Sequence, residues 1–145
     1  MKEQVIVICG PTASGKTSLG IKLAKKIEGE IVSCDSMQIY KDMTIGTAKP
    51  TDEERKEAKH YLVDFVMPNE RYSVSEYKKD AEYTIEQIIK SGKKPIIVGG
   101  TGLYLNSLVY GIDYPNIETD LNYRQELEDR VNKEGLENLY KEANK

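Results

Sequence analysis

The segment CGPTASGKTS at residues 9–18 constrains the fold of this chain more than any other. It contains the pattern G-x-x-x-x-G-K-T, and the short apolar run QVIVI at residues 4–8 precedes it. Apolar residues at helical spacing follow, and we predict that this helix ends at Gly29. A strand, a glycine-rich loop and a helix in this order are typical of a phosphate-binding loop, in which backbone N–H groups and the helix N-terminus attract anions. A glycine turn without a ligand is the alternative, and it would leave Lys16 and Thr17 without a role.

The candidate phosphate-binding residues are consecutive in the chain. They are Gly10, Pro11, Thr12, Ala13, Ser14, Gly15, Lys16 and Thr17. Lys16 supplies a full positive charge, and the Thr17 hydroxyl is a candidate ligand for a Mg²⁺ ion that the phosphates hold. The pattern is common among proteins that bind ATP and other nucleotides, but a diphosphate of any organic group would also fit it.

Strand-like and helical patterns alternate along the first part of the chain. The predicted strands span residues 4–8, 30–35, 60–66 and 94–102, the last running into a glycine-rich turn. Capping boxes predict that helices begin after Thr51 and Ser73, and a further helix should follow the glycine-rich turn and end at Gly111. This alternation predicts an α/β fold, a mostly parallel sheet that carries the phosphate-binding loop and is flanked by helices.

The chain changes character near residue 112, which predicts two parts. Residues 1–112 form the predicted catalytic core, whereas residues 113–145 are polar and helical and resemble the beginning of a helical insertion that is not complete. Residues 1–111 contain 16 Lys/Arg and 15 Asp/Glu, and residues 112–145 contain 5 and 9. Bulk charge alone therefore does not favour nucleic-acid binding, least of all in the second part.

Three segments with functional side chains each follow a predicted strand, at residues 10–17, 35–38 and 99–101. Ligands of parallel sheets bind beyond the carboxyl ends of the strands, so we expect these segments to converge on one edge. Asp35 could hold Mg²⁺ through water, act as a general base, or cap a turn. Lys49 could contact an anion or remain solvated. The glycines of VGGTG at residues 98–102 would allow backbone to approach a ligand, or would serve a tight turn.

Composition excludes several other classes of site and location. The two cysteines, Cys9 and Cys34, are too few for a zinc site, and we expect them to be reduced and buried. The single histidine, His60, argues against a multi-histidine metal site. The sequence has neither a signal peptide nor an apolar run long enough to cross a membrane, so we expect a cytoplasmic protein.

Five segments together resemble one known family. These segments are GPTASGKT, DSMQIY, IGTAKP, YSVSEY and VGGTGLYL. Their order and spacing resemble those of motifs in the bacterial-type tRNA dimethylallyltransferases, which are also called tRNA isopentenylpyrophosphate transferases. The similarity covers residues 5–111 and continues more weakly to the end. It implies a Mg²⁺-dependent transfer of a dimethylallyl group from dimethylallyl diphosphate to N6 of the adenosine next to the anticodon, in tRNAs that read codons beginning with U.

The resemblance also implies roles for individual residues. Asp35 corresponds to the family's general base, Thr101 to a threonine near the reacting centre, and Lys16 to the lysine that stabilises the leaving diphosphate. The residues implied to contact tRNA are Asp35, Ser36, Met37, Gln38, Thr101 and Arg124. The implied cofactor is Mg²⁺ and the implied partners are dimethylallyl diphosphate and the tRNA anticodon loop; we expect a monomer that does not bind membranes.

Two other interpretations stay open at this point. The family's sequences are longer, so this chain would lack their C-terminal half, and an inert nucleotide-binding module remains an alternative. A small-molecule or nucleotide kinase could use the same loop for ATP. Phosphoryl transfer needs several cations around the transferred group, whereas the only arginines here are Arg55, Arg71, Arg124 and Arg130.

Overall fold

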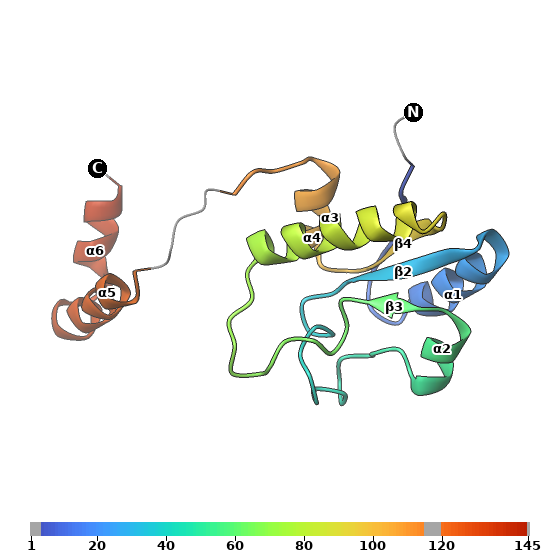
Figure 1. Cartoon of the computed structure of the whole chain (residues 1–145). Helices are drawn as coiled ribbons and strands as arrows, with labels where there is room; N and C mark the ends of the chain where they lie inside the picture. Colours follow the sequence, from blue (N-terminus) through green and yellow to red (C-terminus); the bar gives the residue numbers. More distant parts are fainter. Residues whose placement is uncertain (1–3, 115–119, 145) are drawn as a thin grey trace. The chain divides into compact units, whose positions relative to one another are not determined.

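The computed structural model describes residues 4–114 and 120–144. The chain forms two compact units that divide after Asp113. The core unit contains a sheet with helices, and the C-terminal unit contains two helices (Figure 1).

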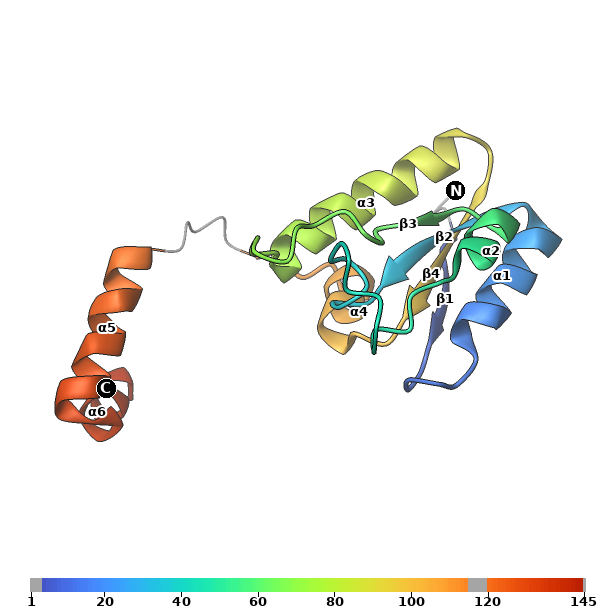
Figure 2. The same cartoon turned by 90° about the horizontal axis from the view of Figure 1, so that it is seen from below.

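A four-stranded parallel sheet forms the centre of the core unit (Figure 2). Its strands are β1 (Ile6–Cys9), β2 (Gly29–Cys34), β3 (His60–Tyr61) and β4 (Lys94–Gly99), in the order β1-β4-β2-β3. Every pair is parallel, and Ile96 of β4 lies opposite Ile6 on one side and Ile31 on the other. The carboxyl ends of all four strands therefore lie at the same edge, which confirms the predicted α/β class.

Helices cover both faces of this sheet because each presents an apolar side at helical spacing. On one face, α1 (Lys16–Ile27) packs Ile21 and Ala24 against Ile31 and Ile96. On the other face lie α3 (Val74–Lys90) and α4 (Gly102–Val109), whose Tyr77 and Tyr104 rings stack with centroids 4.0 Å apart (Figure 1). The short α2 (Asp52–Glu57) follows the loop after β2.

Both predicted capping boxes are confirmed. Thr51 accepts a hydrogen bond from the N–H of Glu54 at the start of α2, and the Glu54 carboxylate accepts one from the N–H of Thr51. Ser73 and Glu76 make the same reciprocal pair at the start of α3. These bonds satisfy N–H groups that a helix leaves without intrahelical partners.

Two predicted boundaries differ from the structure. The strand predicted at residues 60–66 contains only His60 and Tyr61, because Leu62 and Asp64 both adopt positive φ angles of 57° and interrupt the ladder. Helix α1 ends at Ile27, the C-cap Glu28 takes the left-handed conformation in place of the predicted Gly29, and Gly29 already begins β2. The predicted closure of a helix by Gly111 is confirmed: α4 ends at Val109, Gly111 follows the C-cap Tyr110 with φ of 59°, and the N–H of Ile112 donates back to the Ser107 carbonyl at 3.2 Å.

The C-terminal unit consists of α5 (Leu121–Glu134) and α6 (Leu136–Ala143). Asp120 caps α5 by accepting hydrogen bonds from two backbone N–H groups of its first turn. Gly135, with φ of 81°, separates the helices, and Arg130 of α5 forms an ion pair of 2.8 Å with Glu142 of α6. None of the helices within the described ranges is long and apolar enough to cross a membrane.

Candidate active site

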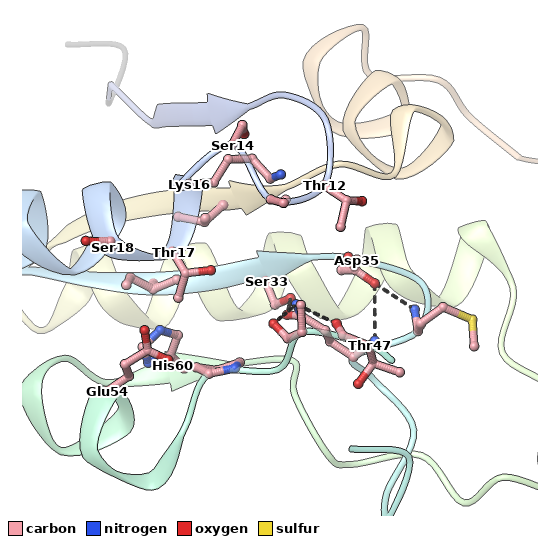
Figure 3. Close-up of a pocket in the computed structure, with 18 of the residues that line it drawn as sticks. Thr12, Ser14, Lys16, Thr17, Ser18, Ser33, Asp35, Thr47, Glu54 and His60 are labelled. Atoms are coloured by element: carbon pink, nitrogen blue, oxygen red, sulfur yellow. Dashed lines mark hydrogen bonds between the residues drawn. The ribbon is translucent and has the colours of Figure 1, made fainter. Parts of the chain in front are cut away.

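A pocket of about 470 Å³ lies at the carboxyl edge of the sheet (Figure 3). Its walls come from the loop after β1, the turn after β2, the end of β4 and the loop that leads to α2. The lining residues are Thr12, Ala13, Ser14, Gly15, Lys16, Thr17, Ser18, Ile31, Ser33, Asp35, Met37, Gln38, Gly46, Thr47, Ala48, Pro50, Glu54, His60, Val98 and Gly99. The three segments predicted to converge all contribute to this edge of the sheet, and each supplies at least one lining residue.

The phosphate-binding loop forms one wall of the pocket. Gly15 adopts φ of 80° and serves as the N-cap of α1, a conformation that glycine takes at no steric cost. Lys16 is the first helical residue, and its ammonium group donates a hydrogen bond of 2.6 Å to the Pro11 carbonyl. The unpaired N–H groups of the first turn of α1 and this cation give the wall a positive potential. The wall therefore suits an anion with several oxygens.

Asp35 follows β2 and faces the pocket beside this wall (Figure 3). Its Oδ1 atom accepts hydrogen bonds from the N–H groups of Met37 at 2.9 Å and Gln38 at 3.2 Å. The turn-capping interpretation of Asp35 is thus confirmed. It leaves room for a second role, because within the described residues no hydrogen bond engages the other carboxylate oxygen, Oδ2.

The glycine-rich turn after β4 is held against the end of β2. The N–H groups of Gly100 and Thr101 both donate to the Cys34 carbonyl, at 3.2 and 3.1 Å. A Cβ atom on Gly99 would lie 2.1 Å from that same carbonyl oxygen, so only glycine fits there. Close approach between the two strand ends thus explains Gly99, rather than close approach to a ligand.

Thr101 connects this turn to the segment that follows Asp35. Its Oγ1 atom accepts a hydrogen bond of 2.9 Å from the N–H of Ser36 and lies 3.3 Å from the Ser36 hydroxyl. Two hydroxyl groups from different strand ends are therefore neighbours, directly after the Asp35 carboxylate. Neither side chain lines the pocket itself.

Gln38 links the floor of the pocket to the loop at residues 44–48 on its opposite side. Its Oε1 atom accepts a hydrogen bond of 3.1 Å from the Ser33 hydroxyl. Its amide nitrogen donates to the carbonyls of Ala48 at 2.9 Å and Thr47 at 3.3 Å. Both ends of the amide are engaged, so the side chain has a fixed orientation and ties the loop to β2.

Lys49 belongs to a structural ion pair and does not line the pocket. Only 4% of its side chain is exposed, and its ammonium group donates to Asp64 and to the Tyr40 carbonyl, both at 2.5 Å. Arg55 also pairs with Asp64. Partial burial alone would raise the pKa of Asp64, but the two cationic donors outweigh this effect and hold its pKa below the usual value. The expectation that Lys49 is either solvated or available to an anion is therefore wrong.

His60 and Cys34 are both neutral groups beside the site. Burial lowers the pKa of His60, and its Nδ1 atom lies 2.8 Å from the Ala58 carbonyl. The neutral ring then donates from Nδ1 and presents Nε2, which has no partner among the described residues, as an acceptor.

Burial raises the pKa of the Cys34 thiol to about 11, so Cys34 packs as a small apolar side chain. Cys9 is exposed, against expectation, because β1 is an edge strand.

The structure thus places the predicted site residues in three groups. Those that line the pocket are Thr12, Ala13, Ser14, Gly15, Lys16, Thr17, Asp35, Met37 and Gln38. Gly10, Pro11, Ser36 and Thr101 lie next to it but do not line it. Arg124 lies in α5 of the C-terminal unit, where it pairs with Glu128 at 3.2 Å.

Several pocket residues have no predicted role in the site, among them Ser18, Ser33, Glu54 and His60. Ser33 was two residues before Asp35 on a predicted strand, so its side chain could have been placed on the same face. Glu54 was recognised only as a capping residue. Nothing in the local sequence of His60 indicates that it lines the same pocket as the phosphate-binding loop.

A metal ion bound here would depend on the ligand's own oxygens. No group of three or more His, Cys, Asp or Glu side chains within residues 4–114 and 120–144 could hold a metal. Mg²⁺ is commonly held by one or two protein oxygens together with substrate phosphates and water. The Thr17 hydroxyl and the Asp35 carboxylate, both in the pocket, fit that donor set.

Comparison with known proteins connects this geometry to a family. The profile of the family described as IPP transferase matches residues 38–145, most of the chain. The chain belongs to this family. Curated relatives of this IPP transferase chain include the tRNA dimethylallyltransferases of Acetivibrio thermocellus, 51% identical over 95% of the chain, and of Alkaliphilus oremlandii, 48% identical over 97%.

Solved structures agree with this assignment. The full-length tRNA isopentenylpyrophosphate transferase of Bacillus halodurans matches with a TM-score of 0.77 and 43% identity, over 98% of this chain and 47% of that one. A eukaryotic dimethylallyltransferase described as acting on tRNA matches with a TM-score of 0.74 and 39% identity, over 86% and 31%. The IPP transferase chain described here spans 44–45% of the length of the two curated relatives. These similarities favour prenyl transfer over the kinase interpretation.

Proposed function

We propose that this chain is the donor-binding part of a tRNA dimethylallyltransferase. The reaction would transfer a dimethylallyl group from dimethylallyl diphosphate to N6 of the adenosine next to the anticodon, in tRNAs that read U-initial codons. The observation that carries the proposal is one pocket that brings the phosphate-binding loop and Asp35 together, in a chain of the IPP transferase family.

The pocket residues suit the two halves of this reaction. The exocyclic amine of adenine is a poor nucleophile because the ring shares its lone pair. Asp35 would accept the proton that this nitrogen loses as its bond to C1 of the dimethylallyl group forms. The bond between C1 and the diphosphate oxygen breaks with its electron pair remaining on that oxygen. Lys16 and the N–H groups of the loop would stabilise the resulting negative charge on the diphosphate.

Thr17 is the residue that would hold Mg²⁺ together with the diphosphate oxygens and water. When bound, the ion would neutralise part of the charge on the leaving group. The chain's own contribution is to keep the hydroxyl, the carboxylate and the ammonium group around one pocket.

We further propose that the turn after Asp35 meets the target nucleotide. Ser36 and Thr101 are joined by hydrogen bonds, and Gln38 is held at both ends of its amide, so the contact surface is preorganised. An adenosine in a single-stranded loop is cheaper to unstack than one in a duplex, which suits an anticodon loop. Arg124 and the C-terminal unit, as the beginning of a helical insertion, would add contacts to the tRNA backbone. Such an enzyme would act as a monomer in the cytoplasm.

Two substitutions separate the roles of the loop and the carboxylate. We expect Lys16→Ala to weaken binding of dimethylallyl diphosphate with Mg²⁺ by about a hundredfold, because it removes charge-assisted bonds worth about 3 kcal/mol. Asp35→Ala should leave donor binding within a few fold. In a chimaera that joins residues 1–145 to the remainder of the Acetivibrio thermocellus relative, Asp35→Ala should abolish transfer to an anticodon stem-loop RNA.

The reverse pattern would contradict these roles. If Asp35→Ala abolished donor binding while Lys16→Ala spared it, the diphosphate would not lie on the loop. Lys22→Ala is the matched control for removal of a lysine from α1, since Lys22 is exposed and does not line the pocket.

A further inference from the structure

The carboxyl end of β2 extends beyond its partner strand β3. Strand β3 pairs only with Ile31 and Val32, because Leu62 adopts φ of 57° and the chain leaves the ladder there. The N–H of Ile31 donates to the Lys59 carbonyl, so the backbone groups of Ile31 point toward the β3 side. Successive residues of a strand point their backbone groups to alternate sides, so the Ser33 carbonyl points to the same side, beyond the last paired residue of β3.

The Tyr77 hydroxyl supplies the hydrogen bond that β3 is too short to make. Tyr77 lies near the start of α3, is 0% exposed, and donates a buried hydrogen bond of 3.0 Å to the Ser33 carbonyl. Burial raises the pKa of Tyr77, so its hydroxyl stays protonated and remains a donor. A buried carbonyl without a donor lowers stability, so this bond gives the hydroxyl of Tyr77 a role that a phenylalanine ring could not fill.

Other interactions hold the same strand end from different directions. Two N–H groups of the turn after β4 donate to the Cys34 carbonyl, and the Ser33 hydroxyl donates to Gln38. Asp35 follows at once and lines the pocket with Ser33 (Figure 3). Tyr77 does not line the pocket. Its effect on the site must therefore pass through the end of β2.

We propose, on the basis of the function proposed above, that Tyr77 is a positioning residue for Asp35, through its hydrogen bond to the Ser33 carbonyl. The Oδ1 atom of Asp35 is bound to the turn that follows, so the direction of Oδ2 depends on where β2 ends. A displacement of about 1 Å at a reacting group can lower a rate about a hundredfold. The diphosphate lies on the loop after β1 in this account, so loss of the Tyr77 hydroxyl should slow transfer without weakening donor binding.

Tyr77→Phe tests this role because it removes only the hydroxyl and keeps a ring that can stack on Tyr104. The protein to use is the chimaera of residues 1–145 with the remainder of the Acetivibrio thermocellus relative. We expect kcat for transfer to an anticodon stem-loop RNA to fall at least about tenfold, and KM for dimethylallyl diphosphate to stay within about twofold. Replacement of Tyr77 by p-aminophenylalanine, which has an N–H donor at the same place, should restore kcat to within about threefold of wild type.

Tyr72→Phe is the matched control. The Tyr72 hydroxyl donates to Asp80 of α3 at 2.6 Å rather than to β2, so this variant loses the same group and a hydrogen bond elsewhere. It should leave kcat within about twofold of wild type. Circular dichroism of each variant checks that the fold is kept.

A second readout needs no transfer reaction. The N–H groups of Met37 and Gln38 donate to Asp35, so their amide resonances report on the position of its carboxylate. In the isolated chain, proton–nitrogen correlation spectra should show that both resonances shift in Tyr77→Phe and keep their positions in Tyr72→Phe.

The proposal is overturned if Tyr77→Phe lowers kcat no more than Tyr72→Phe does, or if the two amide resonances stay in place. If Tyr77→Phe does not fold, the p-aminophenylalanine variant decides: kcat within about threefold of wild type supports the proposal, and a larger loss despite the retained donor overturns it. Absence of transfer by the wild-type chimaera would refute the proposed function instead, because the amide resonances would still show whether Tyr77 positions Asp35.

Discussion

Gly99 provides the most direct test of how the fold positions the candidate site. A Cβ atom there would lie 2.1 Å from the oxygen and 2.4 Å from the carbon of the Cys34 carbonyl. Both contacts are with backbone, so no side-chain rotation relieves them. Gly99→Ala must therefore push the end of β4 away from the end of β2, where Asp35 and Thr101 are held.

The cost can be assembled from the structure. Overpacking a well-packed position costs about 1–3 kcal/mol. Separation of the strand ends also removes the hydrogen bonds from Gly100 and Thr101 to the Cys34 carbonyl, each worth about 0.5–1.5 kcal/mol. We expect Gly99→Ala to lower the free energy of unfolding by about 2–6 kcal/mol.

Gly102→Ala is the control, because a Cβ atom at this first residue of α4 would meet nothing within 4 Å. It should raise the free energy of unfolding by up to about 1 kcal/mol by restricting the unfolded chain. Urea unfolding followed by near-UV circular dichroism of the tyrosines measures both variants. A free energy for Gly99→Ala within about 0.5 kcal/mol of wild type would refute the argument that this glycine is required by close approach of two strands.

Two further perturbations follow from the charges and thiols around the site. In the native protein we expect Ellman's reagent to label Cys9 rapidly and Cys34 only after unfolding, since burial raises the pKa of Cys34 to about 11; rapid labelling of native Cys9→Ser would show that this is wrong. Asp64→Asn should lower the free energy of unfolding at pH 7 by about 2–4 kcal/mol, because it leaves the ammonium group of Lys49 buried without a counter-charge. The pKa of Asp64 is lowered in the native state, so its stabilisation is present above about pH 4 and is lost as pH falls through the native pKa. The difference from wild type in urea unfolding should thus shrink at pH 3, and an equal difference at both pH values would contradict the ion-pair account.

Local chemistry made much of the fold predictable. The capping boxes at Thr51 and Ser73 are short-range patterns, and both helices begin where these patterns place them. The phosphate-binding loop is equally local, because its glycines, lysine and following helix form one continuous segment. The position of Asp35 at the end of a strand is predictable for the same reason, since the short segment EIVSC directly before it is strand-like.

Long-range contacts decided what the sequence did not predict. The segment after Tyr61 has a strand-like composition, but Leu62 and Asp64 turn the chain away so that Asp64 meets Lys49 and Arg55. No pattern around Lys49 distinguishes a buried ion pair from an anion-binding side chain.

Long-range contacts also determine the order of the strands in the sheet. It follows from packing across the sheet, and it places β1 at an edge and exposes Cys9. A short apolar strand reads the same in a sequence whether it lies at an edge or in the interior.

Above all, we propose that the phosphate-binding loop holds the diphosphate of a prenyl donor rather than a nucleotide. Calorimetric titration of this chain with Mg²⁺ and either dimethylallyl diphosphate or ATP tests it most directly, with Lys16→Ala as the control. We expect clearly tighter binding of dimethylallyl diphosphate than of ATP, and we expect Lys16→Ala to abolish it. Tighter binding of ATP, or binding of the prenyl donor that Lys16→Ala does not weaken, would contradict it.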